Sequence, residues 1–203
     1  MKQSLTHATA TRHLKRQDDV LGELIRRVGP CMLQKQGGTF QLLARSILSQ
    51  QISTAAARTI RQRLMRQMPN GRISALRVVE LTDDQFSAAG VSQQKRSYIR
   101  DLAHRVVDGR VNLRRLARAD DNEVIAELTQ VKGIGVWTAQ MFLLFGLGRP
   151  DVFAPDDLGL QNAIKALYEK PKADRKKIES IAVKWAPYRS VASWYLWRSL
   201  DGT

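Results

Sequence analysis

The chain has 203 residues and a formal net charge of +14, because 33 Lys and Arg stand against 19 Asp and Glu. Its single cysteine, Cys31, excludes a disulfide framework and any all-cysteine metal site, and the lack of a long apolar run excludes a membrane-spanning helix. The positive charge favours a polyanionic partner such as nucleic acid, with ribosome binding, membrane-surface binding or a merely well-solvated basic surface as the alternatives.

Apolar residues recur with helical spacing along most of the chain, and period-two alternation is almost absent. The sequence therefore predicts an all-α protein. Residues 1–16 are basic and contain no acid, which favours a flexible tail, with a transit peptide as the alternative. The predicted helices lie, in chain order, near residues 18–28, 40–48, 55–68, 75–79, 83–88, 93–107, 112–116, 121–129, 136–142, 157–168, 173–185 and 189–200.

A glycine pair stands between two of these predicted helices. Gly133 and Gly135 flank one apolar residue, and glycine reaches left-handed backbone angles without a Cβ penalty, so the spacing predicts a very tight turn. Gly135 then begins a helix whose unpaired backbone N–H groups and dipole suit a phosphate oxygen. An ordinary helix C-cap glycine followed by a turn is the alternative.

Four segments together carry a resemblance to a known family. They are LTQVKGIGVWTA at residues 128–139, ILSQQIS at 47–53, DVFAPDD at 151–157 and YRSVASWYLW at 188–197. The chain resembles the helix-hairpin-helix DNA glycosylases, a superfamily named for the hairpin, a Gly/Pro-rich loop and an aspartate. Within it the likeness points to the 3-methyladenine DNA glycosylase II group, and it covers roughly residues 17–200.

The resemblance implies a two-lobed helical fold with a cleft between the lobes, formed by residues 17–203. One lobe is expected at about residues 38–150, and the other joins the N-terminal helix to about residues 151–203. The N-terminal β domain and the iron–sulfur cluster of some relatives are expected to be absent, and no cofactor is expected. The implied partner is double-stranded DNA containing damaged bases, bound by a monomer in a bacterial cytoplasm (nucleoid) or a eukaryotic nucleus, with no membrane involved.

By the same resemblance, Asp157 is the catalytic residue. Breaking an N-glycosidic bond builds positive charge on the sugar, and a fixed carboxylate stabilises that charge and orients or deprotonates the attacking water. Asp156 directly follows Pro155 and is predicted to be the better helix N-cap. Leu160 lies three residues from Asp157 and four from Asp156, so helical spacing does not choose between the two acids, and a plain double-acid helix start is the alternative for both.

Contact with DNA is expected at two places. A damaged base must leave the stack to be cut, and the Gln50-Gln51 turn matches the family segment that fills the gap, with Gln51 at the intercalating position. Two exposed helix-end glutamines are the alternative. The hairpin residues Lys132, Gly133 and Gly135 are expected to hold the phosphate backbone, and in the family the hairpin carbonyls often hold a monovalent cation.

The base pocket is expected to contain Trp137, Trp197, Met141 and Leu158. A cationic alkylated purine stacks well on an electron-rich aromatic face. Trp137 stands where bifunctional relatives carry a Schiff-base lysine, which implies a monofunctional enzyme without lyase activity. Met141 and Leu158 replace tyrosines of relatives, so the preferred lesion stays open. Trp185 and Trp194 are predicted to be core residues. Lys95 and Arg96 are either further phosphate contacts or a solvated face.

The expected function is therefore a monofunctional DNA glycosylase of base excision repair that hydrolyses the N-glycosidic bond of flipped-out alkylated bases such as 3-methyladenine. Two alternatives stay open: a non-catalytic helix-hairpin-helix protein that binds DNA damage, and a glycosylase for deaminated or mismatched bases. Asp157 in its matched setting argues against the first, since binding alone needs no carboxylate there.

Overall fold

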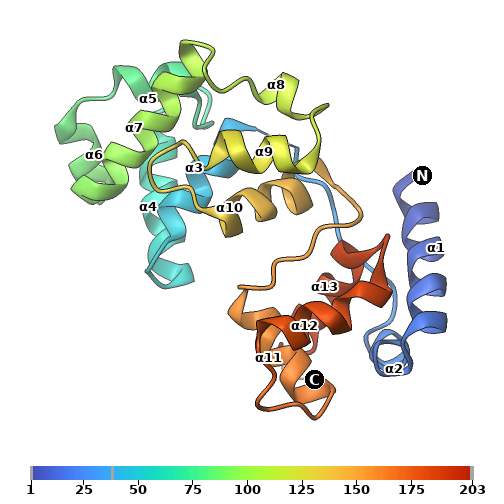
Figure 1. Ribbon diagram of the computed structural model, residues 1–203. Helices are drawn as coiled ribbons and strands as arrows, with labels where there is room; N and C mark the ends of the chain where they lie inside the picture. The colour runs from blue at the N-terminus through green and yellow to red at the C-terminus, as the bar shows by residue number, and fades with distance from the viewer. Residues whose placement is uncertain (1, 38, 202–203) are drawn as a thin grey trace. The chain divides into compact units, whose positions relative to one another are not determined.

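The computed structural model describes residues 2–37 and 39–201, which contain helices and connecting segments but no strand. The prediction of an all-α protein is confirmed. The chain divides into two compact units, unit 1 with Met1–Lys35 and Gly148–Thr203 and unit 2 with Gln36–Leu147 (Figure 1). No helix among the described residues is long and apolar enough to cross a bilayer.

Unit 2 is a continuous stretch of chain that closes on itself, because the amide of Gln36 donates to the carbonyl of Phe145 at 2.7 Å. Its central helix α7 packs against α3 and α5 around a core that includes Leu43, Ile99 and Leu102. The helices of unit 2 are α3 (Phe40–Ser49), α4 (Thr54–Arg66), α5 (Ala75–Glu80), α6 (Asp83–Ala89), α7 (Gln93–Val107), α8 (Leu113–Leu116), α9 (Asp121–Leu128), α10 (Val136–Met141) and the π-helix η1 (Phe142–Leu147).

Unit 1 joins the start of the chain to its end. Helix α13 packs against α1, α2 and α11, so the last helix is central to this unit. The helices of unit 1 are α1 (Lys2–Gln17), α2 (Asp19–Val28), α11 (Leu158–Leu167), α12 (Arg175–Ala182), the 3₁₀ helix η2 (Val183–Trp185) and α13 (Arg189–Arg198).

The expectation of a flexible tail at residues 1–16 is wrong for the residues that the structure describes. Residues 2–17 form α1, and the side chains of Ala10 and Leu14 are fully buried. The charged residues of this segment lie on its outward face, while its apolar residues pack onto α2 and α13. Composition alone missed the helix because only a few apolar residues mark its buried face.

A buried carboxylate ties the two ends of unit 1 together. Asp18, which is 2% exposed, is the N-cap of α2 and accepts the Leu21 amide at 3.0 Å. Its other oxygen accepts from the Tyr168 hydroxyl at 2.6 Å and from the Trp185 indole at 2.8 Å. Lys184 lies 3.1 Å from the same oxygen. Burial raises the pKa of Asp18, but the hydrogen bonds outweigh this effect and leave the pKa below its usual value.

Candidate functional site

Asp157 is the N-cap of α11, and its carboxylate is fixed by two donors. One oxygen, Oδ1, accepts the Leu160 amide at 2.8 Å and the Trp197 indole N–H at 3.0 Å. The residue is only 9% exposed. Both hydrogen bonds direct this oxygen toward the first turn of α11 and the indole of Trp197. The position therefore holds the carboxylate in a defined direction.

The prediction that Asp156 is the better N-cap is wrong. The turn after Pro155 continues through Asp156, and α11 begins only at Leu158, which makes Asp157 the capping residue. Asp156 is exposed and both of its oxygens accept from Arg175 at 2.9 Å. The two neighbouring acids thus have different partners: one faces a surface arginine and the other is enclosed beside Trp197.

Gly159 is a site residue that the sequence analysis missed. A Cβ built at this position would lie 3.1 Å from Asp157 Oδ1 and 3.1 Å from Trp197 Cδ1. Only a residue without a side chain lets the carboxylate and the indole approach each other over the first turn of α11. The signal was a glycine early in a helix, where it lowers helix propensity unless close packing requires it.

Helix α13 fixes the loop that leads to Asp157. The Arg189 guanidinium forms a bidentate pair with Asp151, with both N to O distances at 2.8 Å. Ser190 Oγ accepts the Val152 amide at 2.9 Å and donates to the Arg149 carbonyl at 2.7 Å. Two of the segments noted in the sequence, 151–157 and 188–197, are therefore joined by hydrogen bonds at both ends. Hydrogen bonds to α13 therefore fix the backbone of the loop that precedes Asp157.

The hairpin at residues 128–139 turns on a glycine with a left-handed backbone. Gly133 has φ +78°, and a Cβ there would lie 2.1 Å from the Tyr98 ring of α7. Ile134 between the glycines is buried, and its amide donates to Val131 O at 3.1 Å. Gly135 is exposed, begins α10 without a side-chain cap, and has open space around its Cβ position.

Two side chains from other helices support this turn. Asp101 of α7 accepts the Lys132 amide at 2.9 Å, and Gln50 donates through Nε2 to the Gly133 carbonyl at 2.8 Å. Asp101, Gln50 and Tyr98 therefore hold the hairpin turn in place. Sequence reasoning missed Tyr98 and Asp101, because their contacts cross 31 residues or more and nothing local marks them. Lys132 is an exposed residue, and its backbone amide already donates to Asp101.

Gln50 and Gln51, predicted together, have different environments. Gln50 is half-buried and bonded to the hairpin, whereas Gln51 is exposed and has φ +56°. A left-handed backbone is uncommon for a residue with a side chain and persists where the surrounding structure imposes it. The turn after α3 therefore presents Gln51 outward on a constrained backbone.

The predicted pocket residues are divided between the units. Asp157, Leu158 and Trp197 belong to unit 1, and Trp137 and Met141 belong to unit 2. Of the four side chains, Trp197 contacts Asp157 directly. Trp137 is 43% exposed and Leu158 is 72% exposed. In contrast, Trp185 is fully buried, as predicted for a core residue, while Trp194 is half-buried with its ring edge against Tyr195.

Lys95 and Arg96 both have partners within unit 2. Lys95 Nζ donates to the Leu48 carbonyl at the end of α3 at 2.9 Å, and Arg96 pairs with Asp83 at 2.8 Å. Burial lowers the pKa of Lys95. Neither residue is therefore a simple solvated cation: Lys95 ties α7 to the end of α3, next to the Gln50-Gln51 turn, and Arg96 ties α7 to the start of α6.

Residues 44–187 match the family model described as "HhH-GPD superfamily base excision DNA repair protein". The chain belongs to the HhH-GPD superfamily. Among curated relatives, the "DNA-3-methyladenine glycosylase 1" of Schizosaccharomyces pombe is 32% identical over 202 residues, which cover 97% of this chain and 88% of the relative. The "Putative DNA-3-methyladenine glycosylase YfjP" of Bacillus subtilis is 32% identical over 174 residues, and the match spans only 59% of that protein's length.

Solved HhH-GPD structures agree with this assignment. A DNA-3-methyladenine glycosidase from Bacillus halodurans superposes with a TM-score of 0.86 at 36% identity, covering 95% of this chain and 89% of that one. The S. pombe 3-methyladenine DNA glycosylase Mag1 in complex with abasic DNA gives 0.83 at 30% identity, covering 94% and 96%.

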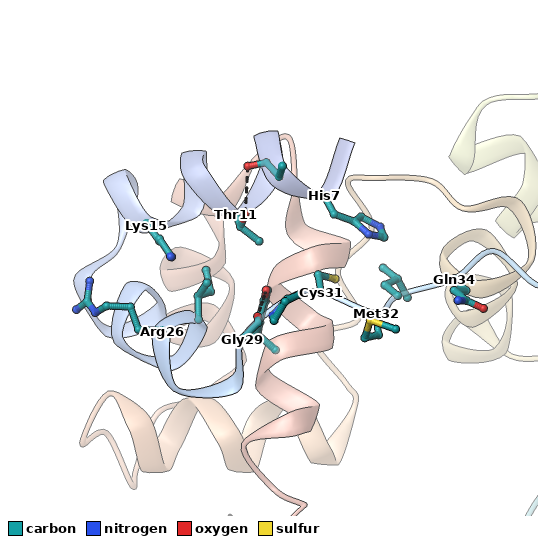
Figure 2. Close-up of a pocket in the computed structure, with 13 residues that line it drawn as sticks. His7, Thr11, Lys15, Arg26, Gly29, Cys31, Met32 and Gln34 are labelled. Carbon is teal, nitrogen blue, oxygen red and sulfur yellow. Dashed lines mark hydrogen bonds between the residues drawn. The ribbon is translucent and has the colours of Figure 1, made fainter. Parts of the chain in front are cut away.

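A separate pocket of about 740 Å³ lies in unit 1 of this HhH-GPD chain, lined by parts of α1, α2 and α13 (Figure 2). Lys15, Arg26 and Cys31 line it, but Asp157 and Trp197 do not. Burial raises the pKa of the Cys31 thiol, which disfavours a reactive thiolate. Among the described residues, no group of three His, Cys, Asp or Glu is placed to hold a metal ion.

Proposed function

We propose that this chain is a DNA glycosylase that hydrolyses the N-glycosidic bond of alkylated bases such as 3-methyladenine. The observation that carries the proposal is the Asp157 carboxylate, enclosed at a helix N-terminus with one oxygen held by Leu160 and Trp197. Relatives named as DNA-3-methyladenine glycosylases support the substrate class, including one that matches nearly the whole chain.

Asp157 would act on the sugar of an extruded nucleotide. As the bond to the base breaks, the sugar gains oxocarbenium character, and a fixed negative charge stabilises that state. The same carboxylate would orient a water molecule or take its proton as it attacks. Both roles require a carboxylate held in a fixed position, which the two hydrogen bonds to Oδ1 provide.

DNA would be held by the hairpin and opened by the turn after α3. The open space above Gly135 lets a phosphate approach the backbone closely, and Lys132 adds a mobile cation. Gln51, exposed on its left-handed backbone, is the side chain that we assign to the gap left by the extruded base. We assign Gln50 to positioning the hairpin, because its amide donates to Gly133.

Two indole rings are our candidates for contact with the base, Trp197 beside Asp157 in unit 1 and the exposed Trp137 in unit 2. A cationic alkylated purine is attracted to the face of an indole. Since Trp137 replaces the lysine of bifunctional relatives, no amine is supplied at that position for a Schiff base, and the product is a free base with an intact abasic strand. A monovalent cation at the hairpin carbonyls stays a prediction. Two of these carbonyls already accept a hydrogen bond, Gly133 from Gln50 and Val131 from Ile134.

The proposal is tested by incubating the purified chain with synthetic duplexes that each carry one lesion: 3-methyladenine, 7-methylguanine, uracil or a mismatched base. We expect free methylated base without strand cleavage before alkali treatment. Release of uracil or a mismatched base alone would reject the alkylation assignment. Binding to every duplex without release of any base would reject the enzyme assignment and favour the non-catalytic alternative.

A further inference from the structure

A hollow of about 260 Å³ lies between α3 and α4 of unit 2. Three arginines line it: Arg45 from α3, and Arg58 and Arg61 from α4. The hydroxyl residues Ser49 and Thr54, at the facing ends of the two helices, complete its polar lining. The hollow thus contains guanidinium donors and two hydroxyls, of which Ser49 Oγ already donates to the Arg45 carbonyl at 2.8 Å, and no carboxylate is part of its wall.

The three arginines are not neutralised by neighbouring acids. Residues 24–79, which include both helices, contain no Asp or Glu. Among the described residues, none of the three forms an ion pair, whereas Arg96 and Arg100 share Asp83, Arg175 pairs with Asp156 and Arg189 pairs with Asp151. Several arginines elsewhere in the described residues are paired with acids, whereas this cluster stays positive.

The cluster has an electrostatic cost in the free protein. Arg45 and Arg61 are half-buried, and burial together with the nearby Arg61 charge lowers the pKa of Arg45. Like charges in a partly desolvated place repel each other, and a bound anion would reverse that effect. Arginine suits this role because its planar fork matches two phosphate oxygens at once.

The position of the hollow relates it to the DNA-contacting turn. Ser49 and Thr54 flank the segment that carries Gln50 and Gln51, so the cluster and the exposed Gln51 lie on the same helix-turn-helix of unit 2. We propose that Arg45, Arg58 and Arg61 bind a backbone phosphate of DNA beside the nucleotide gap that Gln51 fills. This is a second backbone contact, distinct from the hairpin, and it rests on the proposed function in taking DNA as the partner and Gln51 as the side chain that fills the gap.

The test compares two double variants with the same change in charge. Arg45→Gln/Arg61→Gln removes the half-buried pair, and Arg114→Gln/Arg118→Gln removes two exposed arginines in or next to α8 of the same unit, a helix drawn well apart from α4 (Figure 1). Binding to an undamaged duplex is measured by fluorescence anisotropy over a range of salt concentrations. The slope of log K against log salt concentration is negative, and each lost phosphate contact reduces its magnitude by about 0.9.

For the Arg45→Gln/Arg61→Gln variant we expect a slope that is smaller in magnitude by about one. Its affinity at moderate salt should be roughly tenfold lower, with the control near wild type. Its melting temperature should be unchanged or higher, because a repelling pair has been removed. A slope equal to that of the control would overturn the proposal. A lower melting temperature with an unchanged slope would do so too, because it would indicate a merely structural role.

Two further measurements separate the sources of the effect. Inorganic phosphate, compared with chloride at equal ionic strength, is added to the wild type and the variant in melting experiments. Stabilisation by phosphate in the wild type alone, with no change in the DNA slope, would replace the DNA contact by a site for free phosphate. Base release by the wild type is measured in parallel. If no base is released but the magnitude of the slope still falls, the proposed function fails and the phosphate site stands.

Discussion

At the scale of single residues, two adjacent aspartates have opposite environments. Asp156 pairs with Arg175 at the surface, while Asp157 is enclosed and bonded to Leu160 and Trp197. A solvated carboxylate gains little from one more positive charge nearby, because water screens it. An enclosed one interacts strongly with a charge that develops beside it, and for this reason we propose Asp157 rather than Asp156 as the catalytic carboxylate.

Gly159→Ala is expected to separate activity from stability. Alanine stabilises a helix interior by about 0.5–1 kcal/mol over glycine, which opposes the cost of the contact with Asp157 and Trp197. The carboxylate and the indole must shift by a few tenths of an ångström to admit the new Cβ. We expect single-turnover base release to fall by about tenfold or more, since misplaced catalytic groups are costly, with little change in melting temperature.

The control for this prediction is Gly22→Ala in α2, where a Cβ would lie 3.4 Å from the nearest atom, the Lys15 carbonyl oxygen. It should leave base release at the wild-type rate. A Gly159→Ala variant with wild-type release would show that Asp157 needs no such close packing.

Asp18→Asn is expected to destabilise unit 1 in a pH-dependent way. The folded pKa of Asp18 lies below its unfolded value of about 4, so its charge stabilises the fold fully above that pH and the contribution is lost as pH falls through the folded pKa. Loss of the charged hydrogen bonds should cost about 2 kcal/mol or more at pH 7.

Urea unfolding at pH 7 and at steps from pH 5 to pH 3 measures this difference. The gap between wild type and Asp18→Asn should narrow as the pH falls below about 4. A gap that stays constant with pH would mean that the charge of Asp18 contributes nothing.

At the scale of elements, the hairpin separates into a structural glycine and an open one. Gly133 has a left-handed backbone against Tyr98, whereas Gly135 faces open space. Alanine at Gly133 would combine backbone strain of about 1–2 kcal/mol with a steric clash, so we expect a clear fall in melting temperature. Alanine at Gly135 should leave the melting temperature unchanged.

The functional outcome of Gly135→Ala follows from the same geometry. A methyl group at this position would stand where a phosphate must approach the backbone, so binding should weaken several-fold for damaged and undamaged duplexes alike. Anisotropy with both duplexes measures this. A defect confined to one lesion would contradict a backbone role for Gly135.

The sequence predicted most elements because their signals are local. Asp18, Ser92 and Asp120 begin helices as N-caps, and Gly90 ends one with a left-handed backbone, so the predicted boundaries of these helices hold within a residue or two. Helix α1 was missed because few apolar residues mark it. The N-cap of α11 was assigned to Asp156 because nothing local decides between two adjacent acids after a proline.

At the scale of the whole molecule, the family and its motifs could be read from the sequence, but the contacts that support them could not. The resemblance named Asp157, Trp197 and the hairpin. Tyr98, Asp101 and Gly159 act through partners that are distant in sequence, and a single sequence carries no record of such pairs. The arginines at the α3–α4 hollow were missed for another reason: the acid-free stretch 24–79 is visible in the sequence, but only the packing of α3 against α4 brings Arg45, Arg58 and Arg61 to one hollow.

The charge of the whole chain implies that DNA affinity depends strongly on salt, whereas the chemical step does not. A net charge of +14 attracts any duplex, damaged or not. Selectivity must then arise after binding, when a base leaves the stack and meets Asp157. Binding and base release are therefore separable, and the decisive measurement has to record both.

That measurement is the single-turnover release of 3-methyladenine by Asp157→Asn, with Asp156→Asn as the matched control and duplex affinity measured on the same preparations. We expect Asp157→Asn to lose about 10² or more in rate while binding DNA as tightly as wild type or tighter, and Asp156→Asn to keep wild-type release. Release at the wild-type rate by Asp157→Asn, or loss of DNA binding in that variant, would contradict the role assigned to this carboxylate.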